Sequence, residues 1–268
     1  MIFYLEPQQF IDTSSAIDLS LPLSATPENP RAWYVDAPRM EPVRANGFVG
    51  SVAEGGAVNF RDVYFNPHGH GTHTEAHGHI SQEIYPVNRA IQQYFYRATL
   101  LSVTPRVLTN GDHVVFADQL ESLLSNSYTE AIIIRTLPNH LEKKSANYSG
   151  TNPTYFDVGV VDLLDQLEVK HFLVDTPSVD REEDAGVLAF HHAFWKVPEA
   201  PIGDRTITEL VFVPNEVQDG SYILELQVAN FTNDAAPSRP LLYAINEKKD
   251  WRISPFPSSR QNCLSGAF

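Results

Sequence analysis

The sequence contains a single cysteine, Cys263, among its 268 residues. One thiol can form neither a disulfide framework nor a thiolate metal site, so any bound metal needs histidine and carboxylate ligands. Basic residues are also scarce, because 19 Lys and Arg stand against 33 Asp and Glu, which gives a net charge of −14 with histidine neutral. The chain lacks the basic surface on which nucleic-acid binding depends, and we expect no nucleic-acid partner.

Long apolar runs are missing as well. No stretch approaches the roughly 18 apolar residues of a membrane span, and the first residues, MIFYLEPQQF, have neither the basic flank nor the apolar run of a signal peptide. We therefore expect a cytoplasmic protein with no membrane partner. With 43% hydrophobic and 11% aromatic residues the chain can bury a sizeable core, and we expect one domain over residues 1–268.

Short runs rich in β-branched residues and bounded by Pro, Gly or Asn predict strands. They cover residues 98–103, 131–136, 172–175, 209–213 and 222–230. Apolar residues at helical spacing after Asp157 predict a helix over 156–169, and a weaker pattern predicts another over 118–125. This mixture indicates an α/β or α+β domain with much irregular loop.

The ten histidines are unevenly spread. Five of them lie within residues 68–79, where an even distribution would place fewer than one: His68, His70, His73, His77 and His79. If residues 73–79 are extended, the period of two puts His73, Glu75, His77 and His79 on one face, converging on one volume. Glycines before this run allow a tight turn, so that His68 or His70 folds back onto the same site.

Imidazole and carboxylate ligands suit Zn, Mn or Fe in an open catalytic site. The alternative is a solvated, non-specific histidine loop, which needs neither the interleaved Glu75 nor the pair Gly71-Thr72. Further along, His191-His192 on its own indicates one core and one surface histidine. Glu209 stands among apolar neighbours, and a buried carboxylate there needs a charged partner or a metal.

These segments together resemble the metal-dependent hydrolases of the cyclase family, to which bacterial kynurenine formamidase and isatin hydrolase belong. The family signature His-x-Gly-Thr-His-x-Asp-x-Pro-x-His is matched in register over residues 71–79. Residues 17–20, 174–180, 207–209 and 234–239 are similar to other family segments. In this chain Glu75 replaces the signature Asp and His77 the Pro, and the first His falls on Gly69. One residue is therefore inserted, and we prefer His68 to His70 as the first ligand.

The resemblance implies a swivelling β/β/α domain that assembles as a homodimer or homotetramer. It implies that one or two divalent ions, Zn or Mn, are held by His68, His73, Glu75, His191 and Glu209. His79 matches the family's catalytic proton donor and acceptor. Trp33 matches a residue that lines the substrate pocket.

The implied reaction is hydrolysis of the C–N bond in a small-molecule amide or lactam by metal-activated water. Two alternatives use the same histidines: a metal- or ligand-binding protein without turnover, and an Fe(II) oxygenase with two His and one carboxylate. A serine hydrolase is disfavoured because no Gly-x-Ser-x-Gly elbow is present.

Overall fold

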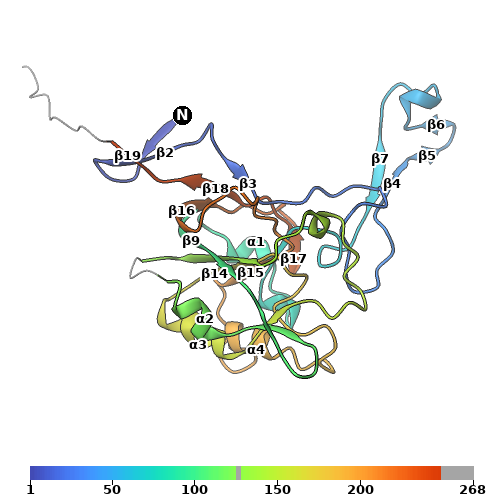
Figure 1. The fold of residues 1–268 in the computed structure, drawn as a ribbon. Coiled ribbons are helices and arrows are strands. Elements are labelled where there is room, and N and C mark those ends of the chain that lie inside the picture. The colour runs from blue at the N-terminus through green and yellow to red at the C-terminus, as the bar shows by residue number, and fades with distance from the viewer. Residues whose placement is uncertain (125–127, 249–268) are drawn as a thin grey trace, which may run out of the picture.

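The computed structural model describes residues 1–124 and 128–248. A curled nine-stranded mixed sheet forms its centre (Figure 1). In spatial order the strands are β17 (Ala235–Pro237), β8 (His73–Glu75), β15 (Thr206–Glu209), β14 (His171–Val174), β12 (Ala131–Thr136), β9 (Phe95–Val103), β16 (Gly220–Glu225), β18 (Leu241–Ala244) and β3 (Ile17–Asp18).

The middle of this sheet is parallel. Strand β12 runs parallel to β9 and β14, and β14 runs parallel to β15. All six residues of β12, AIIIRT, are buried, as is usual for a parallel strand that is covered on both faces. At one end of the sheet, the edge strand β17 and its neighbour β8 run antiparallel to the strands they pair with.

Alternate residues of the central strands face two separate cores. Ile132 and Ile134 pack with Val160 and other residues on the face that carries helices α2 (Ala117–Glu121), α3 (Gly159–Gln166) and α4 (Ala189–Trp195). Figure 1 shows these helices together below the sheet. Ile133 faces the opposite core, with Leu100. The sheet is thus buried on both sides, and the predicted α/β class is confirmed.

The remaining elements are short. Two three-stranded sheets comprise β1 (Ile2–Tyr4), β2 (Gln9–Asp12) and β19 (Asn246–Glu247), and β10 (Arg106–Val107), β11 (His113–Val115) and β13 (Tyr155–Phe156). An arm made of β4 (Arg39–Pro42), β5 (Arg44–Ala45), β6 (Phe48–Val49) and β7 (Arg61–Tyr64) projects from the body in Figure 1. The helical turns are η1 (Val52–Glu54), η2 (His77–His79), α1 (Val87–Ala90) and η3 (Leu141–Lys144).

Several predicted elements differ in extent from those of the structure. Strand β12 has the predicted bounds, and β9 begins three residues earlier than predicted. The helix predicted over 156–169 spans only Gly159–Gln166, because the chain before it belongs to strand β13. Asp157 does serve its start, since its Oδ1 accepts the N–H of Gly159 at 2.9 Å. The helix predicted over 118–125 is α2, and residue 125 lies outside the described residues.

Two strand predictions were wrong at their ends. Strand β15 ends at Glu209 instead of starting there, because Leu210 adopts a left-handed φ of 55° that breaks the extended run. Strand β16 ends at Glu225, and residues 226–230 form only an isolated bridge at Val228. In the described part of the chain, none of the helices combines the length and apolar character needed to cross a membrane.

Candidate metal centre

The loop before β8 is fixed by Thr72. Its hydroxyl oxygen accepts the N–H of Leu21 at 2.8 Å and donates to the carbonyl of Leu210 at 2.5 Å. Gly71, directly before it, has a φ of 120°, a conformation that L side chains rarely adopt. The Gly-Thr pair of the sequence motif therefore turns the chain sharply into β8 and ties that turn to two distant segments.

Strand β8 presents His73 and Glu75 on one face. The intervening Thr74 points the other way, where its hydroxyl meets that of Thr208 at 2.7 Å. In the antiparallel pairing with β15, His73 lies opposite Glu209. All three site residues are buried, and the side chains of His73 and Glu75 are at most 1% exposed. The end of β15 thus places Glu209 beside His73.

The extended run stops after Glu75, contrary to the prediction that residues 73–79 share one face. Residues 77–79 form the 3-10 turn η2, in which a Cβ on Gly78 would lie only 2.2 Å from the carbonyl oxygen of Tyr85. The turn returns His79 toward Glu75. It sends His77 away, and the His77 ring stacks on Tyr85 with centroids 4.1 Å apart.

Helix α4 supplies His191 to the same site. Leu188 occupies the capping position before this helix, with a left-handed φ of 46°, and its apolar side chain makes no capping hydrogen bond. The Asp180 carboxylate takes over that role by accepting the N–H groups of Phe190 at 2.8 Å and His191 at 3.1 Å. Asp180 also lies 2.6 Å from Nδ1 of His191. This contact turns Nε2 of His191 toward Glu75.

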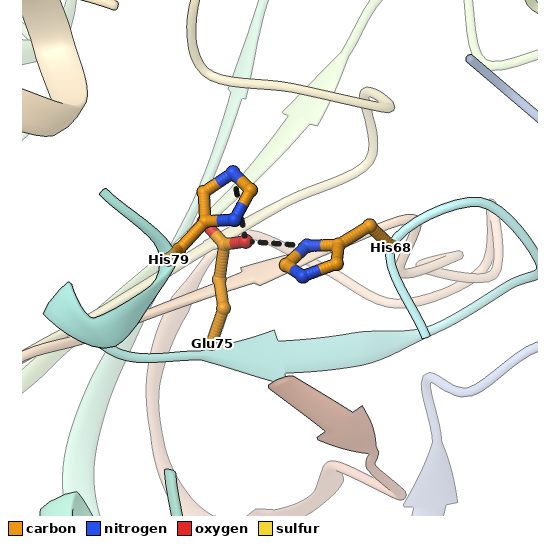
Figure 2. A group of neighbouring side chains, drawn as sticks. All are labelled: His68, Glu75 and His79. Atoms are coloured by element: carbon orange, nitrogen blue, oxygen red, sulfur yellow. Dashed lines mark ion pairs between the residues drawn. The ribbon is translucent and has the colours of Figure 1, made fainter. Parts of the chain in front are cut away.

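The ligand atoms form two groups that share Glu75. In the first, shown in Figure 2, Oε2 of Glu75 lies 2.9 Å from Nδ1 of His68 and 3.9 Å from Nε2 of His79. In the second, Nε2 of His73 lies 3.4 Å from Oε2 of Glu209. His191 joins this group, since its Nε2 lies 3.0 Å from Oε1 of Glu75 and 3.9 Å from Oε1 of Glu209.

Two ligand atoms in this cluster are buried without a well-oriented hydrogen bond among the described residues: Nε2 of His73, and Oε2 of Glu75, whose nearest ring nitrogen is Nδ1 of His68 at 2.9 Å. The other ring nitrogen of His73 lies 3.0 Å from the carbonyl of Gly71, which can only accept a hydrogen bond. The proton of neutral His73 is therefore on Nδ1, and a lone pair on Nε2 faces carboxylate oxygens. A buried lone pair opposite buried carboxylates is costly unless a cation lies between them. The residues present thus fit a divalent metal.

The electrostatics of the cluster agree with a cation site. Burial would lower the pKa of His191, but the carboxylates of Asp180 and Glu75 outweigh it and raise that pKa to about 10. Burial would likewise lower the pKa of His68, but the carboxylates of Asp234 and Glu75 outweigh burial and raise that pKa to about 10. Burial would raise the pKa of Glu75, yet the surrounding histidines hold it well below its usual range. The site attracts positive charge, which protons or a metal ion can supply.

The structure separates His70 from His68. Nδ1 of His70 accepts the N–H of Asn66 at 2.8 Å, and Nε2 lies 2.6 Å from the carbonyl of Asp36. Both ring nitrogens of His70 are thus occupied by backbone groups outside the cluster. His192 also stays outside, with its Nδ1 2.9 Å from the carbonyl of Val197.

A cavity of about 310 Å³ opens over the cluster. It is lined by Glu75, Glu209, three of the cluster histidines, and Trp33, which has a φ of 60°. Arg181, Glu182 and Asp184 line it as well. The structure therefore brings His79, Trp33 and the predicted ligands other than His73 into the lining of one pocket of a size suited to a small molecule.

Two carboxylates of this site were not predicted as site residues. Asp180 contacts His191, as described above. Asp234 lies 2.8 Å from Nε2 of His68 and 3.4 Å from Nδ1 of His79. Both residues lie in segments similar to the family, so their presence was visible in the sequence, but nothing in their spacing indicates which histidine each one contacts.

Comparison with known proteins supports the family resemblance. The family model Cyclase, described as "Putative cyclase", matches residues 17–181, more than half of the chain. That match ends before His191 and Glu209, which the structure nevertheless places at the same site. No relative was found among curated proteins.

Solved structures of similar fold cover most of the chain. Isatin hydrolase A from Ralstonia solanacearum superposes with a TM-score of 0.63 at 16% identity, over 86% of this chain and 92% of that one. Isatin hydrolase A from Labrenzia aggregata, bound to benzyl benzoate, gives 0.60 at 13% identity, over 87% and 94%. A protein from Bacillus stearothermophilus described as a "predicted metal-dependent hydrolase" gives 0.57 at 15% identity, over 85% and 98%. With the matched family model and the shared fold, this chain belongs to the cyclase family.

Proposed function

We propose that this protein is a metal-dependent hydrolase that cleaves the C–N bond of a small amide or cyclic amide. The observation that carries the proposal is the buried Nε2 of His73, which has no hydrogen-bond partner among the described residues and whose lone pair faces Oε2 of Glu209 at 3.4 Å. Glu75 and Glu209 beside it line a cavity large enough for a small molecule. The fold shared with isatin hydrolases supports the same reaction class.

His68, His73, Glu75, His191 and Glu209 would hold one or two divalent ions, Zn or Mn, and Glu75 is shared by both groups of ligand atoms. When bound, such an ion lowers the pKa of a water molecule to about 7 and polarises a carbonyl. The protein contributes ligand geometry, a buried environment and proton transfer.

His79 has the place required of the group that moves protons. It lines the cavity, its side chain is 30% exposed, and its Nε2 lies 3.9 Å from Glu75, farther than the contacting ring nitrogens of His68 and His191 at 2.9 and 3.0 Å. A histidine in this position can take a proton from water and deliver it to the departing nitrogen. Such general acid–base catalysis contributes about 10²–10⁴ in rate. Trp33 would border the bound substrate with its ring.

The test is hydrolysis of formanilide and isatin by untagged protein, before and after removal of metal with a chelator and after return of Zn²⁺ or Mn²⁺. We expect turnover that disappears with the metal and returns with it. Stoichiometric metal binding with no hydrolysis of amides, lactams or lactones would establish a binding protein instead. Oxygen consumption with Fe²⁺ would establish an oxygenase.

We also propose that the protein is a homodimer or homotetramer. The projecting arm supports this, because its two-stranded ribbon has no core of its own and such a ribbon is marginally stable alone. The arm exposes large apolar side chains, including Phe60 at 58% and Val63 at 49%. Light scattering of the purified protein tests the assembly, and a monomer at micromolar concentration would contradict it.

A further inference from the structure

Asp234 is held at the site by its backbone. It directly precedes strand β17, in which Ala235 lies opposite Glu75. Its carbonyl accepts the N–H of Ala76 at 3.0 Å, and the carbonyl of Asn233 accepts the N–H of Val87 at 2.9 Å. The main chain on both sides of Asp234 is therefore tied to the segment that carries Glu75 and the histidine turn. Its main-chain position is thus held by bonds that do not involve the carboxylate.

The Asp234 carboxylate contacts two histidines through one oxygen. Oδ2 lies 2.8 Å from Nε2 of His68 and 3.4 Å from Nδ1 of His79. The two rings stack with their centroids 4.2 Å apart and an interplanar angle of 28°. In each ring Asp234 and Glu75 contact different nitrogens: Glu75 lies nearest to Nδ1 of His68 and Nε2 of His79.

An ionised carboxylate only accepts hydrogen bonds, whereas a neutral imidazole has one N–H and one lone pair. The contacts with Asp234 therefore favour the proton on Nε2 of His68 and on Nδ1 of His79. In the neutral form that binds a metal or accepts a proton, the lone pairs then lie on Nδ1 of His68 and Nε2 of His79, the two atoms that face Glu75. Both histidines are thus poised in the tautomer that a metal ligand or a proton acceptor at this place requires.

We propose that Asp234 is a positioning residue that sets the tautomer and orientation of His68 and His79 together. The proposal rests on the proposed function, since it assigns His68 to metal binding and His79 to proton transfer. The other two histidines of the cluster have separate acceptors, Gly71 for His73 and Asp180 for His191. Of these three acceptors, Asp234 is the one that serves two rings, so its loss affects metal affinity and turnover at once.

The experiment compares the wild-type protein with Asp234→Asn and with Asp204→Asn as a control. Asp204 also makes a 2.8 Å charged contact, with Lys170, but that pair is exposed and lies away from the cluster. Zn²⁺ affinity is measured by competition with a chromophoric chelator, and kcat and KM are measured with formanilide. Loss of a carboxylate behind a metal-binding histidine typically costs about 10–100-fold in metal affinity or activity. We expect that loss in Zn²⁺ affinity and in kcat for Asp234→Asn, with KM little changed, and no loss for the control.

A second readout is the NMR spectrum of the zinc-loaded protein labelled with ¹⁵N-histidine. We expect the His68 Nε2–H and His79 Nδ1–H resonances to shift or vanish in Asp234→Asn, while the His73 and His191 resonances stay in place. A purely structural role would not move two ring protons selectively. If Asp234→Asn fails to fold, Asp234→Glu and Asp234→Gln replace it, because only the former keeps a carboxylate and should recover affinity and kcat.

The outcomes separate the inference from the proposed function. Wild-type protein that neither binds Zn²⁺ nor turns over would overturn both. Wild-type protein that binds Zn²⁺, together with an Asp234→Asn variant of unchanged affinity, kcat and ring-proton resonances, would overturn the role of Asp234 alone. Loss of activity through a raised KM at unchanged kcat would also contradict it, because Asp234 would then act on substrate binding.

Discussion

Replacement of Glu75 by glutamine removes the charge of the carboxylate that both groups of ligand atoms share, and it keeps the size of the side chain. Glu75 lies 2.9 Å from His68, 3.0 Å from His191 and 3.9 Å from His79, and its side chain is 1% exposed. The variant therefore tests whether these contacts reflect a metal site or an ion-pair network within the protein.

The magnitude follows from the burial of this carboxylate. Removal of one partner from a buried charged pair costs about 3–5 kcal/mol. At 1.36 kcal/mol per factor of ten, that cost corresponds to a loss in metal affinity of about 10²–10⁴-fold. The fold itself should persist, because the backbone pairing of Glu75 with Ile207 and Ala235 does not involve its carboxylate.

The assay is metal content by elemental analysis after dialysis against a weak chelator, with circular dichroism at low temperature to confirm folding. Glu182→Gln is the matched control. Glu182 lines the same cavity, but its carboxylate accepts backbone N–H groups of Gly150 and Asn152 at 2.5 and 3.0 Å. We expect Glu75→Gln to lose its metal and Glu182→Gln to retain it. Stoichiometric metal in a folded Glu75→Gln variant would refute the assignment.

Three further predictions concern individual histidines. His68→Ala should empty the metal site, whereas His70→Ala should keep its metal. The His70 variant should lose about 1–3 kcal/mol of unfolding free energy, because two backbone groups lose their hydrogen-bond partner. Metal content and urea denaturation distinguish the two variants. His79→Ala should keep its metal and lose about 10²–10⁴ in kcat with KM little changed, whereas metal loss equal to that of His73→Ala would make His79 a ligand. Burial lowers the pKa of His171 from 6.5 to about 3, so the stability that neutral His171 contributes is complete above pH 6.5 and is lost as the pH falls toward 3. Between pH 7.5 and 5.5 the loss in unfolding free energy is about 1.4 kcal/mol. His171→Asn should remove this part of the pH dependence of stability, and an unchanged pH dependence would contradict the prediction.

The local pattern of the histidine segment predicted a good part of the site. The Gly-Thr turn and the alternation of His73 with Glu75 are features of a few consecutive residues, and β8 has this form. The same alternation failed for His77, because the close approach of Tyr85 to Gly78 turns the chain after Glu75. That approach is a tertiary contact, which the period of a strand does not contain.

The contacts between distant segments could not be predicted from spacing. Asp234 meets His68 across 166 residues, and the pairing of β17 with β8 that brings them together leaves no periodic signal. Helix α4 was not predicted because Leu188 stands where a capping residue would mark its start, and the actual cap is the distant Asp180. The family resemblance, confirmed by the family match and the shared fold, placed His191 and Glu209 in the ligand set where the residues alone left their roles open.

The central claim is that a divalent ion binds between the histidines and Glu75. Anomalous diffraction from crystals of untagged protein loaded with Zn²⁺ or Mn²⁺ tests it most directly. We predict an anomalous peak about 2.0–2.2 Å from a Glu75 oxygen, the usual distance for a carboxylate bound to zinc, with His73, His191 and Glu209 around it. Metal-loaded crystals whose anomalous peaks all lie away from Glu75 would contradict the account.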